Sequence, residues 1–181
     1  MAICSNSLLY GYPLQCRDNS GGIQSVYIGA FDRSNPMTWN LAGVSGASAS
    51  YINAFTGATV SHFNFQMPLN TADWTTAGAF STENGTSVYK STVNITLQKL
   101  TDISLNLTNI LGQGAWRLLI LDQNGNYFLV GAQNGARVSA ATPGTGKALG
   151  DLNGAIITFE AEEPLAAYQV STAAALSVIS N

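Results

Sequence analysis

Charged residues are scarce in this sequence. Asp, Glu, Lys and Arg make up 9% of its 181 residues, against roughly 25% in an average soluble domain. None of them occurs between Ser34 and Ala72. Charge normally keeps protein surfaces apart, so its absence indicates that other chains cover much of this surface. The alternative is a secreted β-protein whose exterior consists of Ser, Thr and Asn.

The few charges that are present exclude some partners. The seven Lys and Arg residues are scattered singly, and the formal net charge is −3. Tight phosphate binding requires clustered cations, which disfavours sequence-specific nucleic-acid binding. The N-terminal segment does not resemble a signal peptide, and no run approaches the roughly 20 apolar residues of a membrane span. We therefore expect a protein that is made in a cytoplasm, stays soluble until it assembles and has no membrane partner.

Cysteine and histidine are too few for familiar metal or catalytic sites. Cys4 and Cys16 are the only cysteines, whereas a structural zinc normally needs four ligands; a disulfide between them and two free thiols both stay open. His62 is the only histidine and lies in an alternating apolar stretch, which favours a packed or interface role over catalysis.

The acidic cluster Glu160, Glu162 and Glu163 could in principle supply paired carboxylates. Its place at the end of a predicted strand favours a solvated or lumen-facing strand end instead. The sequence therefore predicts no catalytic, cofactor or metal site, and a structural or interaction protein rather than an enzyme.

Alternation and turn signals predict a mainly β chain. Strands are expected at 23–31, 88–97 and 155–161, and a long hairpin at 44–68. Apolar residues at helical spacing predict one helix at 101–111, capped by Thr101 or Asp102 and ended by Gly112. Residues 68–87 read as a loop, and residues 164–181 as a terminal strand or arm.

Asn-Gly pairs are strong signals for tight turns. They predict a three-stranded meander over residues 116–140, with strands at 116–122, 127–131 and 136–140, and one further turn before residue 155. The sum is six to nine strands with one flanking helix, in a sandwich or barrel that forms a single domain over residues 1–181. The predicted turn residues are Asn124, Gly125, Asn134, Gly135, Asn153 and Gly154.

Three motifs in a fixed order carry a resemblance to a known family. They are SVYKSTVNITLQKLTDISLNLTNIL, WRLLILDQNGNYFLVGAQNGARVS and GTGKALGDLNGAIITFEAEEPL, and CRDNSGGIQSVYIGAF near the N-terminus also fits. The block from Ser87 to Tyr168 resembles structural proteins of tailed phages, particularly those infecting the Bacteroidota. Among these it looks most like the tail tube proteins.

The resemblance implies a β-sandwich or barrel with a flanking helix and a long hairpin that joins an inner barrel. It also implies self-assembly into stacked, hexameric rings of a virion tail, contacts with other tail proteins, and DNA that passes through the lumen without sequence-specific binding. The hairpin residues that would then lie between subunits are Val44, Tyr51, Ile52, Phe55, Val60, Phe63 and Phe65.

Two alternatives stay open at this point. One is another virion component, namely a head decoration, tail terminator or baseplate protein. The other is a receptor- or glycan-binding β-sandwich, for which exposed aromatic residues such as Trp39, Trp74 and Tyr51 would provide stacking surfaces.

Overall fold

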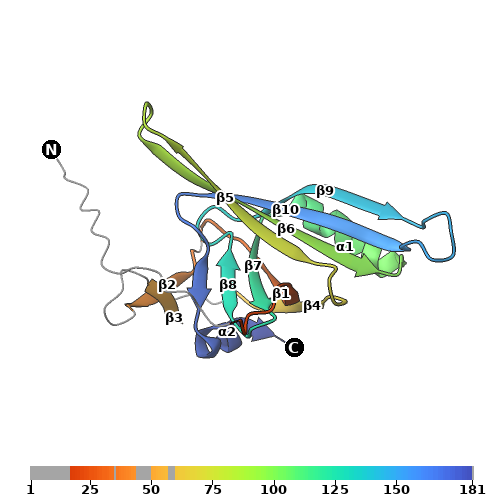
Figure 1. The fold of residues 1–181 in the computed structure, drawn as a ribbon, viewed down its shortest axis with the longest axis horizontal. Coiled ribbons are helices and arrows are strands. Elements are labelled where there is room, and N and C mark those ends of the chain that lie inside the picture. Colours follow the sequence, from red (N-terminus) through yellow and green to blue (C-terminus); the bar gives the residue numbers. More distant parts are fainter. Residues whose placement is uncertain (1–16, 35, 44–49, 57–59, 181) are drawn as a thin grey trace.

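The protein is a two-layered β-sandwich that is not closed into a barrel (Figure 1). The computed structural model describes residues 17–34, 36–43, 50–56 and 60–180. The larger sheet has eight strands in the order β12 (Ile179–Ser180), β4 (His62–Gln66), β1 (Ile23–Ala30), β7 (Trp116–Asp122), β8 (Tyr127–Val130), β11 (Tyr168–Val170), β3 (Ser50–Thr56) and β2 (Thr38–Gly43). The smaller sheet has four, in the order β5 (Asp73–Ser81), β6 (Thr86–Gln98), β10 (Gly154–Glu163) and β9 (Arg137–Gly144).

The main hydrophobic core lies between the two sheets. Alternate residues of a strand point to opposite faces of its sheet. In β10 the side chains of Ile157 and Phe159 are fully buried, whereas Ile156, on the opposite face, is exposed. Leu118 and Ile120 of β7 meet them from the larger sheet. The outer face of the smaller sheet is therefore left to solvent or to a partner.

A second core lies on the opposite face of the larger sheet. It is covered by the short helix α2 (Thr172–Val178), whose buried face consists of Ala174, Ala175 and Val178. Small side chains allow this helix to approach Leu119 and Leu129 closely. The expected arm at 164–181 was wrong, because α2 buries Ala174, Ala175 and Val178 against the domain. The alternative of a terminal strand holds only for β11 and β12, which both pair within the larger sheet.

Helix α1 (Asp102–Gln113) confirms the predicted helix. Thr101 is its N-cap, and Thr101 and Ser104 bond reciprocally in a capping box, which satisfies amides that otherwise lack partners at a helix start. The helix runs past Gly112 to Gln113, and Gly114 is its C-cap. Leu107 and Leu111 anchor it to the main core.

The predicted hairpin at 44–68 was wrong. Its two strands do not pair with each other: β3 pairs with β2 and β11, whereas β4 pairs with β1 and β12. They are separated in the larger sheet by β1, β7, β8 and β11. Alternation correctly indicated two strands, but it carries no information on which strands become neighbours.

The predicted meander was right for its first turn only. Strands β7 and β8 form a hairpin across Asn124 and Gly125, and Gly125 has a φ of 81°. After Asn134 and Gly135 the chain instead crosses to the other sheet, where β9 pairs with β10. One isolated bridge between Trp116 and Ala136 marks this crossover.

Besides the helix α2, two strands were not predicted. The segment read as a loop at 68–87 contains β5 and the start of β6, because Thr, Ala and Gly there carry a weak alternation signal. Strand β2 follows the turn after β1 and was also missed. Over the described ranges the count is twelve strands and two helices, and no helix among them is long and apolar enough to cross a membrane.

Candidate assembly surface

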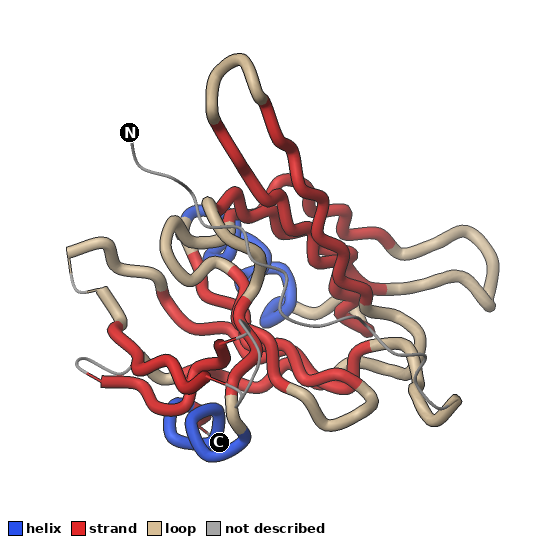
Figure 2. Tube along the Cα trace, turned by 60° about the vertical axis from the view of Figure 1, so that its left-hand side comes forward, coloured by secondary structure: helices blue, strands red, loops and turns tan. Residues whose placement is uncertain are grey.

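The hairpin of β5 and β6 projects beyond both sheets (Figures 1 and 2). The two strands stay paired out to Ser81 and Thr86 at the tip. Side chains are exposed from Ala77 to Phe80 and from Thr82 to Val88, so this outer half is uncovered on both faces. We call residues 77–88 the projecting hairpin. A two-stranded ribbon without a packed face is marginally stable in water, and its stability therefore depends on what covers it.

Apolar side chains lie on the projecting hairpin. Phe80 is 67% exposed and Val88 is also exposed. The ring of Phe80 meets that of Tyr89 edge-on, with ring centres 5.5 Å apart. A side chain at Gly78 would collide with the Phe80 ring. Tyr89 is half-buried, and the exposed Phe80 ring that meets it forms a preformed apolar ridge on the hairpin.

The outer edge of β5 has none of the usual protection. Natural edge strands carry Lys, Pro or bulges that block pairing with other chains. Strand β5 is nine residues long and contains neither Lys nor Pro, and its first residue, Asp73, is its one charged residue. It is also paired without a register shift along its whole length. Such an edge can accept a further strand.

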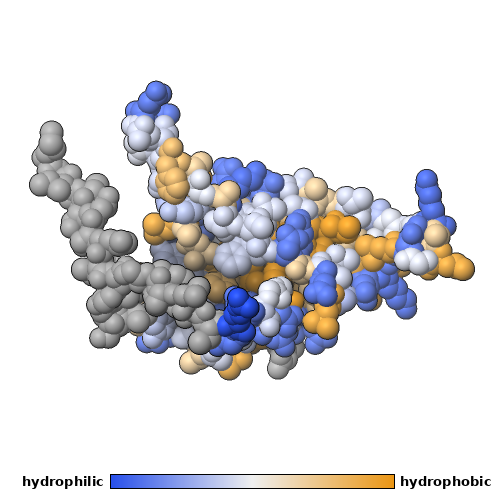
Figure 3. Space-filling view, viewed as in Figure 1, coloured by the Kyte–Doolittle hydropathy of each residue, from blue (hydrophilic) through white to orange (hydrophobic). Residues whose placement is uncertain are grey.

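A second hairpin, formed by β9 and β10, extends from the opposite end of the smaller sheet (Figure 1). Its loop is closed by Asp151, whose carboxylate accepts hydrogen bonds from the backbone N–H of Lys147 and Ala148, both at 2.8 Å. These bonds lower the pKa of Asp151. Hydrophobic atoms extend along this hairpin in Figure 3, and Leu149 is fully exposed.

Helix α1 also leaves apolar side chains uncovered. Ile103 is 75% exposed, and Leu105 and Ile110 are exposed as well. Of the apolar residues at helical spacing in this helix, Leu107 and Leu111 reach the core, whereas Ile103 and Ile110 do not. Together with the two hairpins, this helix places apolar surface around the smaller sheet.

Most of the predicted inter-subunit residues pack inside the chain. Ile52 is fully buried in the second core, Phe55 packs against that core and Phe65 against the main one, whereas Tyr51 and Val60 are half-buried. Only Phe63 is exposed, at 59%. Val44 lies outside the described residues, as do Cys4 and Cys16. The charge-free stretch therefore owes part of its composition to burial within the subunit.

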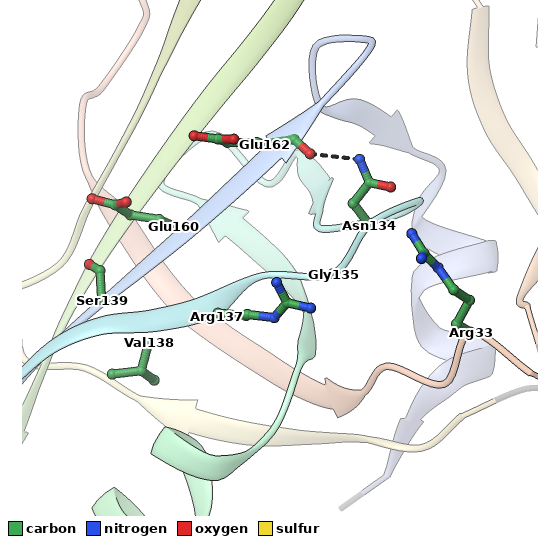
Figure 4. Close-up of a pocket in the computed structure, with 8 residues that line it drawn as sticks. All are labelled: Arg33, Asn134, Gly135, Arg137, Val138, Ser139, Glu160 and Glu162. Atoms are coloured by element: carbon green, nitrogen blue, oxygen red, sulfur yellow. Dashed lines mark hydrogen bonds between the residues drawn. The ribbon is translucent and has the colours of Figure 1, made fainter.

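A charged groove of about 560 Å³ lies beside the crossover between the sheets (Figure 4). The guanidinium groups of Arg33 and Arg137 lie on one side, and the carboxylates of Glu160 and Glu162 on the other. Glu160 forms an ion pair with Lys90 at 2.8 Å. Because the charges of both signs nearly balance, the groove offers no strong field to an ion of either sign.

Glu163 differs from its two acidic neighbours, and the prediction of a solvated or lumen-facing strand end was wrong for it. It is 7% exposed, and its Oε1 accepts hydrogen bonds from the backbone N–H of Gln133 at 2.7 Å and Asn134 at 3.4 Å. Burial raises the pKa of Glu163, and these amides oppose the rise. The side chain ties the end of β10 to the crossover loop.

His62 is packed, as predicted, and not exposed at all. Its ring lies over Gly29, where any side chain would collide with it. Nδ1 lies 2.8 Å from the carbonyl oxygen of Val60, while Nε2 has no partner. Burial lowers the pKa of His62, and the charge of Arg117 lowers it further.

Trp39, Trp74 and Tyr51 are half-buried rather than exposed. Trp39 stacks at a tilt on Tyr168 with ring centres 5.7 Å apart, and Trp74 on Phe128 at 5.1 Å.

Within the described ranges no three His, Cys, Asp or Glu side chains come together as metal ligands. Comparison of the chain with protein-family models, with curated proteins and with solved structures found no match.

Proposed function

We propose that this protein is a structural component of a tailed-phage virion that assembles with copies of itself into stacked rings, as a tail tube does. The observation that carries the proposal is the projecting hairpin with the unprotected β5 edge. A monomer with such an edge and an apolar ridge is prone to uncontrolled association. In an assembled ring the same features become the interface.

The area around the hairpin supports a large interface. Obligate interfaces are apolar and resemble a domain core cut in half. Exposed apolar residues of the projecting hairpin, of the β9–β10 hairpin and of α1 all surround the smaller sheet. An interface of uncharged residues forms without the cost of removing charges from water. The low content of charged residues, 9% of the chain, suits such an interface.

The proposal includes DNA passage through the lumen without specific binding. The sparse and isolated cations would hold phosphates weakly. Hexameric symmetry, the tail position and the contacts with other tail proteins rest on the resemblance alone. A head decoration, tail terminator or baseplate protein would use the same interface features in rings that do not stack.

A glycan-binding β-sandwich is the second candidate. Trp74 lines a pocket of about 370 Å³ with Asp73, Asp122 and Asn124, and its Nε1 has no partner. However, the carboxylate of Asp122 already accepts bonds from its own loop, including Asn124 N–H at 2.9 Å. The aromatic surface is also half-buried, so this candidate has less support.

The test is a matched pair of substitutions examined by negative-stain electron microscopy. Phe80→Lys places a charge on the projecting hairpin, and Leu176→Lys places one at a similarly exposed position on α2, 60% against 67%. We expect Phe80→Lys to leave a folded monomer that forms no tubes, because the charge would be buried without a partner. Leu176→Lys should assemble like the wild type. Equal assembly of both variants would contradict the proposed interface.

A further inference from the structure

Arg117 is a buried cation without a counter-ion in contact. It is 1% exposed, yet its Nε and Nη1 have no hydrogen-bond partner. No carboxylate of the described residues lies within 4.0 Å of its guanidinium group. Burial lowers the pKa of Arg117. Buried charges in native proteins are paired as a rule, so this one indicates a missing partner.

The two carboxylates nearest to Arg117 are engaged elsewhere. Asp32 and Glu163 both favour its charged form through space. Asp32 is exposed, and its Oδ1 accepts a hydrogen bond from the N–H of Ser34 at 2.8 Å. Glu163 is held by the amides of the crossover loop. Neither carboxylate contacts the guanidinium group in the described structure.

Arg117 lines a pocket of about 220 Å³ together with residues that follow the ends of β1 and β8. The ring of Phe31 lies 4.6 Å from its guanidinium carbon and holds it in place by a cation–π contact. Met37 and Trp39 form further apolar walls, and Asp32 and Arg33 line the pocket as well. The volume is below the range of drug-sized sites and large enough for several water molecules.

We propose that this pocket binds a carboxylate with a small apolar group attached, and that Arg117 is its anchor. The guanidinium group matches a carboxylate in shape and charge. The apolar walls would hold the attached group and disfavour a strongly hydrated dianion such as phosphate. Two sources have this chemistry, a free small carboxylic acid and an acidic side chain of a second copy of the chain.

The first arm of the test uses butyrate as the probe and butyramide, which has the same shape without the charge, as its control. We expect butyrate to shift the Nε–H signal of Arg117 in nuclear magnetic resonance spectra and to raise the melting temperature of the dispersed subunit, because a ligand stabilises the state it binds. Butyramide should do neither. This arm does not depend on assembly, so it can succeed or fail independently of the proposed tube.

The second arm uses variants. Arg117→Met should weaken butyrate binding at least tenfold, and without butyrate it should melt at or above the wild-type temperature, because an unpaired buried charge is lost. Arg137 is an exposed arginine of the neighbouring groove, and its variant Arg137→Met should bind butyrate as tightly as the wild type does. Arg117→Lys is the replacement if Arg117→Met fails to fold, and it should weaken binding by a similar factor.

The outcomes separate the two sources. Butyrate binding that needs Arg117 identifies a free carboxylate. A lack of butyrate binding together with a shift of the Arg117 Nε–H signal upon self-association identifies a carboxylate of a second copy. The proposal is overturned if neither butyrate nor self-association changes that signal, or if Arg117→Met binds butyrate as well as the wild type does.

Discussion

Replacing Glu163 with Ala tests how the two sheets are held together. The carboxylate accepts hydrogen bonds from two backbone amides of the crossover loop, at 2.7 and 3.4 Å. A hydrogen bond to a charged group contributes about 1.5–3 kcal/mol. The longer bond adds less, and the loop is near enough to solvent for water to replace part of the loss. We expect Glu163→Ala to lower the free energy of unfolding by about 2–3 kcal/mol.

Two further variants separate the hydrogen bonds from the charge. Glu163→Gln keeps an oxygen acceptor and removes the charge whose burial raises the pKa, so it should cost less than about 1 kcal/mol. Glu162→Ala removes an exposed neighbour on the same strand and should change stability by less than about 0.5 kcal/mol. Urea unfolding at pH 7 measures all three. Equal losses for Glu163→Ala and Glu162→Ala would refute the reasoning.

Two further predictions concern stability alone. The pKa of His62 is lowered in the folded protein, so the unfolded chain binds a proton first as the pH falls below about 6.5. The free energy of unfolding should therefore decrease there by at most about 1.4 kcal/mol per pH unit. In urea titrations His62→Phe should lose this pH dependence, and an unchanged dependence of the unfolding free energy on pH would contradict the reasoning. Gly131→Ala should lower the free energy of unfolding by about 2 kcal/mol or more, because φ is 74° and the new methyl group would lie 2.7 Å from the N of Ala136. Its control, Gly112→Ala, lies in open space on α1 and should raise the melting temperature. Similar melting temperatures of the two variants would show that the crossover loop tolerates a side chain.

The sequence predicted local structure better than it predicted neighbours. Helix α1 and the turn at Asn124 and Gly125 follow from short-range chemistry, and both were predicted. Thr101 was one of two expected caps of the helix, and the expected stop at Gly112 falls one residue before its last residue. The pairing of β3 and β4 was wrong because alternation does not specify a partner strand. The crossover after Asn134 and Gly135 has the same turn signal as a hairpin, and only packing against the second sheet distinguishes the two.

The candidate surfaces were harder still to predict. The projecting hairpin lies in a segment that reads as a loop, since its Thr, Ala, Gly and Ser residues suit both states. A repeated small–polar pattern bounded by Pro68 and the Asn84-Gly85 turn was the signal available. Arg117 stands between a Trp and a run of Leu and Ile residues, and an arginine in such a run was the one sign of its burial. Glu163 could not be separated from Glu160 and Glu162 without strand register.

The most direct test of the central claim is negative-stain electron microscopy of the purified protein over a concentration series. The account predicts that the protein forms long tubes with a regular ring repeat as concentration rises, because the projecting hairpin and the β5 edge find partners in neighbouring copies. Discrete rings that do not stack would move the protein to another position in the virion. A monomer at every concentration would contradict the account.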